Sequence, residues 1–223
     1  MVVFFRTLIV FAAGMLPQLL LASVPGQPET RLISFRVLTG EALPAVYFRP
    51  EPQALPEQLT LFSSAPSKLV QARVPTEFLL FRDAKGEVAL ARVLLTPQAT
   101  GALLIVLRPN PERPAGDLWQ AHVFSAENRP RAGEVSLLNL TGQPIRVDLG
   151  GPTVDLPDGA PGRLTASRRS LLRAAVPMAG IWRRVTQFEI ETEPDSRAWI
   201  ILWAPHRAGL LQPRLQLFFE PPE

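Results

Sequence analysis

The sequence predicts an all-β protein built as two tandem β-sandwich domains that arose by internal duplication. Three observations predict this fold class. Apolar and polar residues alternate over short stretches, turn residues separate these stretches about every 8–12 residues, and several blocks of the first half return in the second. The chain has 223 residues, of which 47% are hydrophobic and 24 are proline. It is therefore long enough for two domains of about 100 residues, and its proline content disfavours long helices.

The N-terminal stretch Met1–Ser23 is typical of a secretory signal peptide. Arg6 supplies a positive charge, an apolar run covers residues 7–16, and the small residue Ala22 precedes the expected cleavage site. Pro17-Gln18 interrupts the run, which is then shorter than the ~20 residues of a membrane span. Cleavage is therefore favoured, although a retained anchor stays open as an alternative. Since the chain has no cysteine, we expect a periplasmic or secreted protein without disulfides and without a span in its mature part.

The internal repeat consists of four blocks that recur in the same order. The first two pairs of blocks are 102 residues apart, and the third pair is 96 residues apart. A polar linker rich in proline and glycine lies between the copies, which predicts one domain over residues 29–127 and a second over residues 134–221. The matched blocks are Ile33–Gly40 with Val135–Gly142, Ser67–Pro75 with Arg169–Pro177, Gly101–Pro109 with Arg197–Pro205, and Ala121–Phe124 with Leu215–Phe218.

Each copy is expected to consist of strands. The segments 33–37, 145–149 and 187–191 alternate between apolar and polar residues, which is the period of a strand with one buried face. Ala102–Leu107 and Ala198–Leu202 are apolar on both faces, which predicts central strands that are covered on both sides. Two further matched segments, residues 69–74 and 171–176, are also predicted to be strands, although the second is compatible with one or two helical turns.

The charge balance indicates no nucleic-acid partner. The formal net charge is only +3, with 23 basic and 20 acidic residues. A nucleic-acid-binding protein needs a clustered basic face instead. The tightest basic cluster is interpreted as a solvated surface, and it consists of Arg163, Arg168, Arg169 and Arg173.

No sequence motif indicates catalysis, a cofactor or a metal. His122 and His206 are the only histidines, and neither has a partner at the spacing of a metal site or a nucleophile motif. Asp155-Leu156-Pro157-Asp158-Gly159 is read as a strand end and a turn rather than a calcium loop. Asn139 begins a glycosylation sequon within an expected strand. We therefore expect a non-enzymatic protein without cofactor or metal; a catalytic site scattered along the sequence stays open.

The tryptophans of the second copy are the candidate ligand or partner residues. Trp199 and Trp203 have the same strand parity, so both side chains point to one face, and Trp182 lies in an earlier segment of the same copy. An exposed row of this kind stacks on sugar rings or on a partner's apolar surface. The alternative, that they fill the core of the second sandwich, is favoured because their neighbours are also apolar.

The stretch Val135–Gly151, a strand followed by a Thr-Gly-Gln-Pro turn and a second strand, resembles the opening hairpin of tandem Ig-like or transthyretin-like modules of exported bacterial envelope proteins. The resemblance implies an envelope protein-binding or scaffolding module whose contact is an edge strand or an apolar face, and whose partner is another envelope protein or a surface polymer. The size and layout are also similar to those of periplasmic pilus chaperones, which bind by adding a strand to an incomplete sheet. A carbohydrate-binding accessory module that uses the tryptophan-rich face is the third hypothesis.

Overall fold

The computed structural model describes residues 30–43, 45–51, 53–62, 64–97, 99, 101–110, 118–125, 128–193, 196–207 and 209–220. The predicted signal peptide, Met1–Ser23, lies outside these residues and stays a prediction. Within the described ranges the regular structure is β-strand, and no α-helix occurs. None of the described segments is a helix long and apolar enough to cross a membrane.

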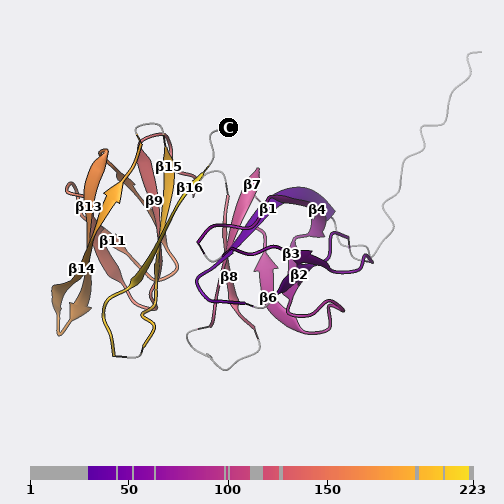
Figure 1. Cartoon of the computed structure of the whole chain (residues 1–223). Helices are drawn as coiled ribbons and strands as arrows, with labels where there is room; N and C mark the ends of the chain where they lie inside the picture. The colour runs from indigo at the N-terminus through magenta and orange to yellow at the C-terminus, as the bar shows by residue number, and fades with distance from the viewer. Residues whose placement is uncertain are drawn as a thin grey trace, which may run out of the picture.

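The strands form four sheets of four strands each, which pack in two pairs as two β-sandwiches (Figure 1). The predicted all-β fold of two sandwiches is thereby confirmed. The first sandwich contains β1 (Thr30–Thr39), β2 (Val46–Phe48), β3 (Glu57–Leu59), β4 (Val70–Pro75), β5 (Glu77–Phe81), β6 (Ala89–Leu94), β7 (Ala102–Arg108) and β8 (Gln120–Phe124). The second contains β9 (Glu134–Leu140), β10 (Ile145–Asp148), β11 (Val154–Leu156), β12 (Pro161–Thr165), β13 (Arg169–Met178), β14 (Ile181–Glu191), β15 (Arg197–Trp203) and β16 (Arg214–Glu220).

The two sandwiches have the same topology. In the first, sheet A has the order β4-β1-β7-β8 and sheet B the order β3-β2-β5-β6. In the second, sheet C has the order β12-β9-β15-β16 and sheet D the order β11-β10-β13-β14. Each strand of the first sandwich therefore has an equivalent eight strands later. In both sandwiches the first and seventh strands pair in parallel, while the other ladders are antiparallel.

The topology supports the first matched block and corrects the second. Ile33–Gly40 and Val135–Gly142 occupy the equivalent strands β1 and β9. Ser67–Pro75 contains β4, an edge strand of sheet A. Arg169–Pro177 lies in β13, an inner strand of sheet D. The equivalent of β13 is β5, so the second pairing was wrong. Both segments are strands, as predicted, and they look alike because each buries every second residue.

The third matched block is shifted by one residue. Phe35 on β1 lies opposite Leu103, and its equivalent Leu137 on β9 lies opposite Ile200. The true offset is therefore 97 residues, not the 96 that the sequence comparison predicted. A slip of one residue moves a side chain to the other face of its sheet. The structural counterpart of Trp203 is accordingly Val106.

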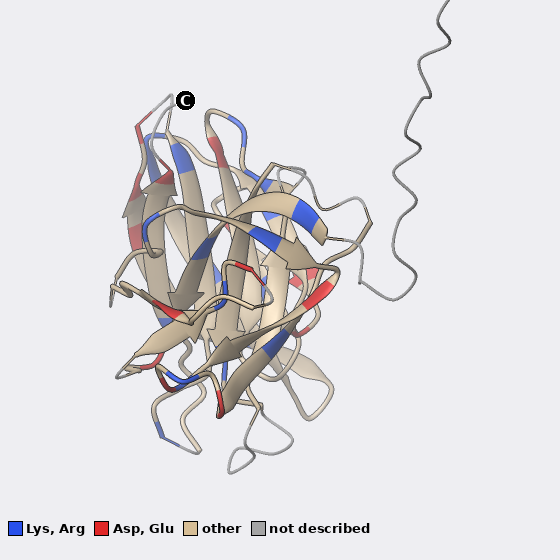
Figure 2. Cartoon of the chain, turned by 90° about the vertical axis from the view of Figure 1, so that its right-hand side faces the viewer, with Lys and Arg blue, Asp and Glu red and all other residues tan. Residues whose placement is uncertain are grey.

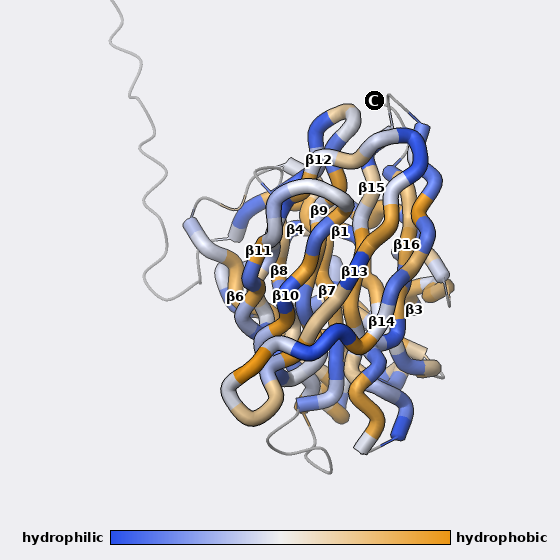
Figure 3. Tube along the Cα trace, turned by 90° about the vertical axis from the view of Figure 1, so that its left-hand side faces the viewer, coloured by the Kyte–Doolittle hydropathy of each residue, from blue (hydrophilic) through white to orange (hydrophobic). Residues whose placement is uncertain are grey.

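Each sandwich has its own apolar core, made by the alternating residues of its two sheets. Phe35 packs edge-on against Phe48 with ring centroids 5.5 Å apart, which joins sheet A to sheet B. In the second sandwich, Leu137 and Ile200 of sheet C share a core with Val147 of sheet D. The alternation that predicted half-buried strands is thus confirmed, and Figure 3 shows it as alternating bands along β10 and β13.

A third apolar core lies between the two sandwiches, where sheet A packs against sheet C (Figure 1). We call this contact the seam. It explains why β7 and β15 are apolar on both faces, because one face covers its own sandwich and the other covers the neighbouring sandwich. The seam residues are Leu38, Leu104, Val106, Phe124, Leu138, Leu140, Trp199, Ile201, Trp203 and Phe218.

Candidate functional site

The structure places Trp199 and Trp203 on one face of β15, as their parity predicts, and this face is the seam. Their side chains are 1% and 3% exposed, so neither forms an open stacking row. Both side chains are buried, but the interpretation that they fill the core of the second sandwich was wrong, because they belong to the core between the two sandwiches. Trp199 stacks on Phe218 with ring centroids 6.3 Å apart and also contacts Phe124 of the first sandwich at 5.9 Å.

Trp182 lies elsewhere, on β14 of sheet D. The Arg146 guanidinium lies 4.3 Å from the centroid of the Trp182 ring, and the same guanidinium forms a bidentate pair with Asp155 at 2.6 and 2.7 Å. The ring is half-buried beneath this pair. The three predicted tryptophans therefore do not come together in one site.

One end of the seam carries two polar ties between the sandwiches. Arg108 at the end of β7 donates to both carboxylate oxygens of Asp158, at 2.8 and 2.7 Å, and its Nε donates to Gln120. Asp158 lies in the turn between β11 and β12, as the sequence predicted for this aspartate. In the second tie, Arg214 on β16 donates to the Gly40 carbonyl oxygen at 2.8 Å and to Glu41 at 2.7 Å.

His122 on β8 packs beside the first tie, next to Arg108 and Asp158. Burial, together with the neighbouring Arg108 charge and against the opposite effect of Asp158, lowers the pKa of His122 to about 4. Its Nε2 is buried and has no hydrogen-bond partner among the described residues. Burial alone raises the pKa of Asp158, but hydrogen bonds from Arg108 and the Gly142 N–H outweigh it and leave this pKa below its ordinary value. His206 lies exposed in the loop after β15.

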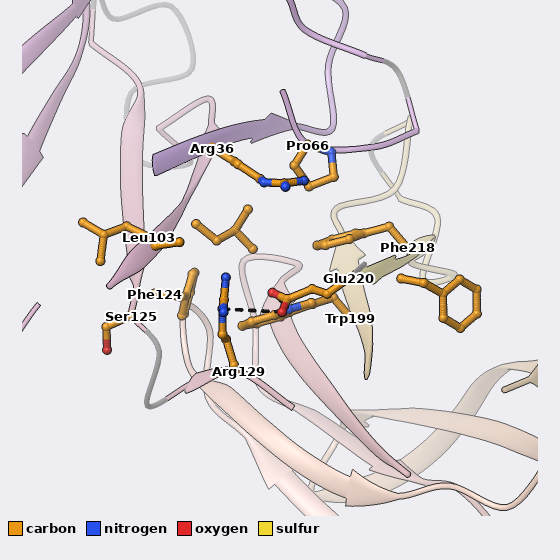
Figure 4. Close-up of a pocket in the computed structure, with 12 residues that line it drawn as sticks. Arg36, Pro66, Leu103, Phe124, Ser125, Arg129, Trp199, Phe218 and Glu220 are labelled. Carbon is orange, nitrogen blue, oxygen red and sulfur yellow. Dashed lines mark hydrogen bonds and ion pairs between the residues drawn. The ribbon is translucent and has the colours of Figure 1, made fainter. Parts of the chain in front are cut away.

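The other end of the seam opens into a groove of about 190 Å³. It lies towards the N-terminal ends of β7 and β15, whereas the Arg108–Asp158 tie lies at the C-terminal end of β7. Figure 4 shows aromatic side chains on its walls and charged groups at its opening. The lining residues are Arg36, Pro66, Ala102, Leu103, Leu104, Phe124, Ser125, Arg129, Trp199, Phe218, Phe219 and Glu220.

The charged groups of this seam groove differ in how they are paired. Glu220 accepts a hydrogen bond from Trp199 Nε1 at 2.9 Å and forms an ion pair with Arg129 at 3.4 Å (Figure 4). Arg36 on β1 is half-buried, and its side chain makes no hydrogen bond or ion pair with any residue that the structure describes. The groove thus holds one engaged carboxylate and one unengaged guanidinium. In the sequence, Arg36 stands out only as a polar residue of an alternating strand, so no motif could have singled it out.

The charged residues on the side shown in Figure 2 are of both signs. Figure 2 shows Lys and Arg interspersed with Asp and Glu over the face that it presents, without a region of one sign. In the Arg163–Arg173 cluster, Arg169 pairs with Glu191 at 3.6 Å and Arg173 pairs with Asp148 at 3.1 Å. This agrees with the interpretation of the cluster as a solvated surface.

Asn139 has a structural role. The Asn139 side chain is buried, and its amide donates to the carbonyl oxygens of Gln143 and Leu156, so it braces the turn that follows β9. Among the described residues, no group of three or more His, Asp or Glu side chains is arranged to hold a metal ion.

Comparison with known proteins gives no family assignment, because no family model matches the sequence and no curated protein matches it significantly.

Proposed function

We propose that the chain is an exported, non-enzymatic binding module of the cell envelope, and that it recruits a protein partner by strand addition at β14. The export component rests on the signal-like sequence of Met1–Ser23. The non-enzymatic component rests on the lack of a chemical motif in the sequence.

The observation that carries the proposal is the free edge of β14. This strand, Ile181–Glu191, is the longest in the described fold, and it ends sheet D with only β13 as a neighbour. An edge strand presents unpaired backbone N–H and C=O groups that a second chain can pair with. Figure 3 shows β14 at the border of the sheet.

The side chains of β14 favour a partner other than a second copy of this chain. Arg183, Arg184, Glu189 and Glu191 are exposed along the strand. A bulge also shifts the register of β14 opposite Ala174 and Ala175. Charges and bulges on an edge oppose pairing between identical chains. The regular stretch after the bulge, Thr186–Glu191, is therefore the segment expected to pair with a different protein.

Single cysteines test this proposal well, because the chain has none of its own. Gln187→Cys places an exposed thiol on β14, and Gln58→Cys places a matched thiol on the short edge strand β3. Each variant is labelled with a photocrosslinker and irradiated in the envelope of the native host. We expect one defined protein adduct from Gln187→Cys and none from Gln58→Cys. Equal adducts from both sites contradict the proposal.

Two proline variants then test whether the backbone edge makes the contact. Neighbouring residues of a strand direct their N–H groups to opposite sides, so of Gln187→Pro and Phe188→Pro one removes an N–H from the free edge and the other breaks the ladder with β13. The variant that keeps the wild-type melting temperature identifies the free-edge position. We expect this variant to lose partner binding at least tenfold. Unchanged binding by it shows that the contact is not strand addition.

A further inference from the structure

We propose that the seam groove binds a small carboxylate carried on a single apolar ring, with Arg36 holding the carboxylate and the aromatic walls holding the ring. This site is separate from β14, because β14 belongs to sheet D and the groove lies between sheets A and C. A negative binding test at the groove therefore leaves the proposal of strand addition at β14 unaffected, and the reverse also holds.

Arg36 supplies the charge that selects an anion. Its position on β1 directs the side chain to the same face of sheet A as Leu38, which is the seam face. The guanidinium is half-buried, lines the groove and makes no hydrogen bond or ion pair with any described residue. Glu220, the acidic group of the lining, is already engaged by Trp199 and Arg129. A guanidinium binds a carboxylate through two parallel hydrogen bonds, which makes a carboxylate the matching group.

The walls supply the apolar part of the site. Phe124 comes from the first sandwich, and Trp199 and Phe218 come from the second. The ring of Trp199 contacts the rings of both Phe124 and Phe218. These three side chains are at most 7% exposed, so they form an apolar floor rather than an open stacking surface. Phe219, which also lines the groove, is 48% exposed and offers the ring face that favours a flat apolar ligand.

The size of the groove limits the ligand to one ring. An apolar cavity of about 150 Å³ accommodates benzene. The groove holds about 190 Å³, which leaves room for a short side chain that reaches Arg36. We therefore choose 3-phenylpropionate as the probe, and 3-phenylpropionamide as its neutral match of nearly equal size.

Calorimetric titration of the full chain measures the binding. We expect 3-phenylpropionate to bind at least tenfold more tightly than the amide, since only the carboxylate forms charge-assisted hydrogen bonds with Arg36. Emission from Trp199 should change in parallel, because its ring lines the groove. Absence of binding at millimolar probe, or equal binding of acid and amide, overturns the proposal.

Three variants locate the site. Arg36→Gln is expected to weaken 3-phenylpropionate binding tenfold or more, whereas Arg73→Gln removes the same charge from an exposed position on β4 and should leave binding within twofold. Ala102→Leu fills the groove without deleting a contact and should also abolish binding. Melting temperatures verify that each variant is folded. Binding that survives both Arg36→Gln and Ala102→Leu in folded protein places the ligand elsewhere and refutes the site.

Discussion

The two repeated Thr-Gly pairs show how one sequence element serves different physical needs. Thr39 and Thr141 play the same part, because each hydroxyl bonds to the carbonyl oxygen two residues later, that of Glu41 or Gln143. The glycines differ. Gly142 has a φ of +85° and open space around its Cα, so its role is conformational. A methyl group on Gly40 would lie 2.6 and 2.7 Å from two atoms of the Trp203 ring, so Gly40 provides space.

This close approach predicts that Gly40→Ala destabilises the protein. The methyl group forces Trp203 out of its place in the seam, and overpacking of this kind costs about 1–3 kcal/mol. Urea unfolding measures the loss. Gly151→Ala is the matched control, since nothing lies within 4 Å of its added methyl group. In a Trp203→Leu background the cost of Gly40→Ala should disappear. An equal cost in both backgrounds rules out the contact as its cause.

The lowered pKa of His122 predicts that the protein becomes less stable in acid. Its folded-state pKa is about 4, below the ordinary value of 6.5, so between these two values the unfolded chain binds a proton that the folded chain does not. The free energy of unfolding is therefore fully retained above pH 6.5 and decreases as the pH falls towards 4, by about 2–3 kcal/mol from this group. His122→Gln should remove that part of the decrease. Urea unfolding at pH 7 and pH 4.5 measures the free energy of unfolding of both proteins. If it decreases by the same amount in the wild type and in His122→Gln, His122 does not cause the decrease.

Among the elements, the turn between β11 and β12 ties the sandwiches together through Asp158. Its partner Arg108 is buried, with a side chain only 8% exposed. Asp158→Asn leaves this guanidinium without its counter-charge, and we expect a loss of about 1–3 kcal/mol. Asp155→Asn breaks another bidentate pair, which is exposed to solvent, so its cost should stay below about 0.5 kcal/mol. Thermal unfolding measures both losses of stability. If the two variants lose equal amounts, burial does not make the Arg108–Asp158 pair more important than the exposed one.

The strands themselves were predictable from the sequence, and their register was not. Alternation in Ile33–Val37 and the apolar residues on both faces of Ala198–Leu202 reflect burial, because burial determines which positions of a strand are apolar. Register depends on which strand lies alongside, and the sequence comparison therefore paired β4 with β13 and slipped β15 by one residue. The groove was beyond prediction for the same reason. Arg36 and Phe218 are 182 residues apart, and only the packing of sheet A on sheet C brings them together.

At the scale of the whole molecule, the seam predicts that neither sandwich is complete alone. A second sandwich expressed as residues 128–220 would expose the seam face of sheet C, including Trp199 and Trp203. An apolar patch of this kind drives self-association. We expect red-shifted tryptophan emission, a lower melting temperature than in the full chain, and dimers or larger species in sedimentation experiments. A monomeric half with the emission and stability of the full chain would show that the seam contributes little.

The seam also has the arrangement of a symmetric homodimer enclosed in one chain. Sheets A and C are topological equivalents, so the contact corresponds to an isologous interface, in which both partners use the same surface. In a true homodimer every substitution occurs twice, and Trp203 would have to be accommodated at both equivalent places. Within a single chain each copy changes alone. Trp203 covers Gly40, while its counterpart Val106 is small and the space next to Gly142 is open. Within one chain the interface therefore does not have to be self-complementary, and the groove at Arg36 lies at one end of this asymmetric contact.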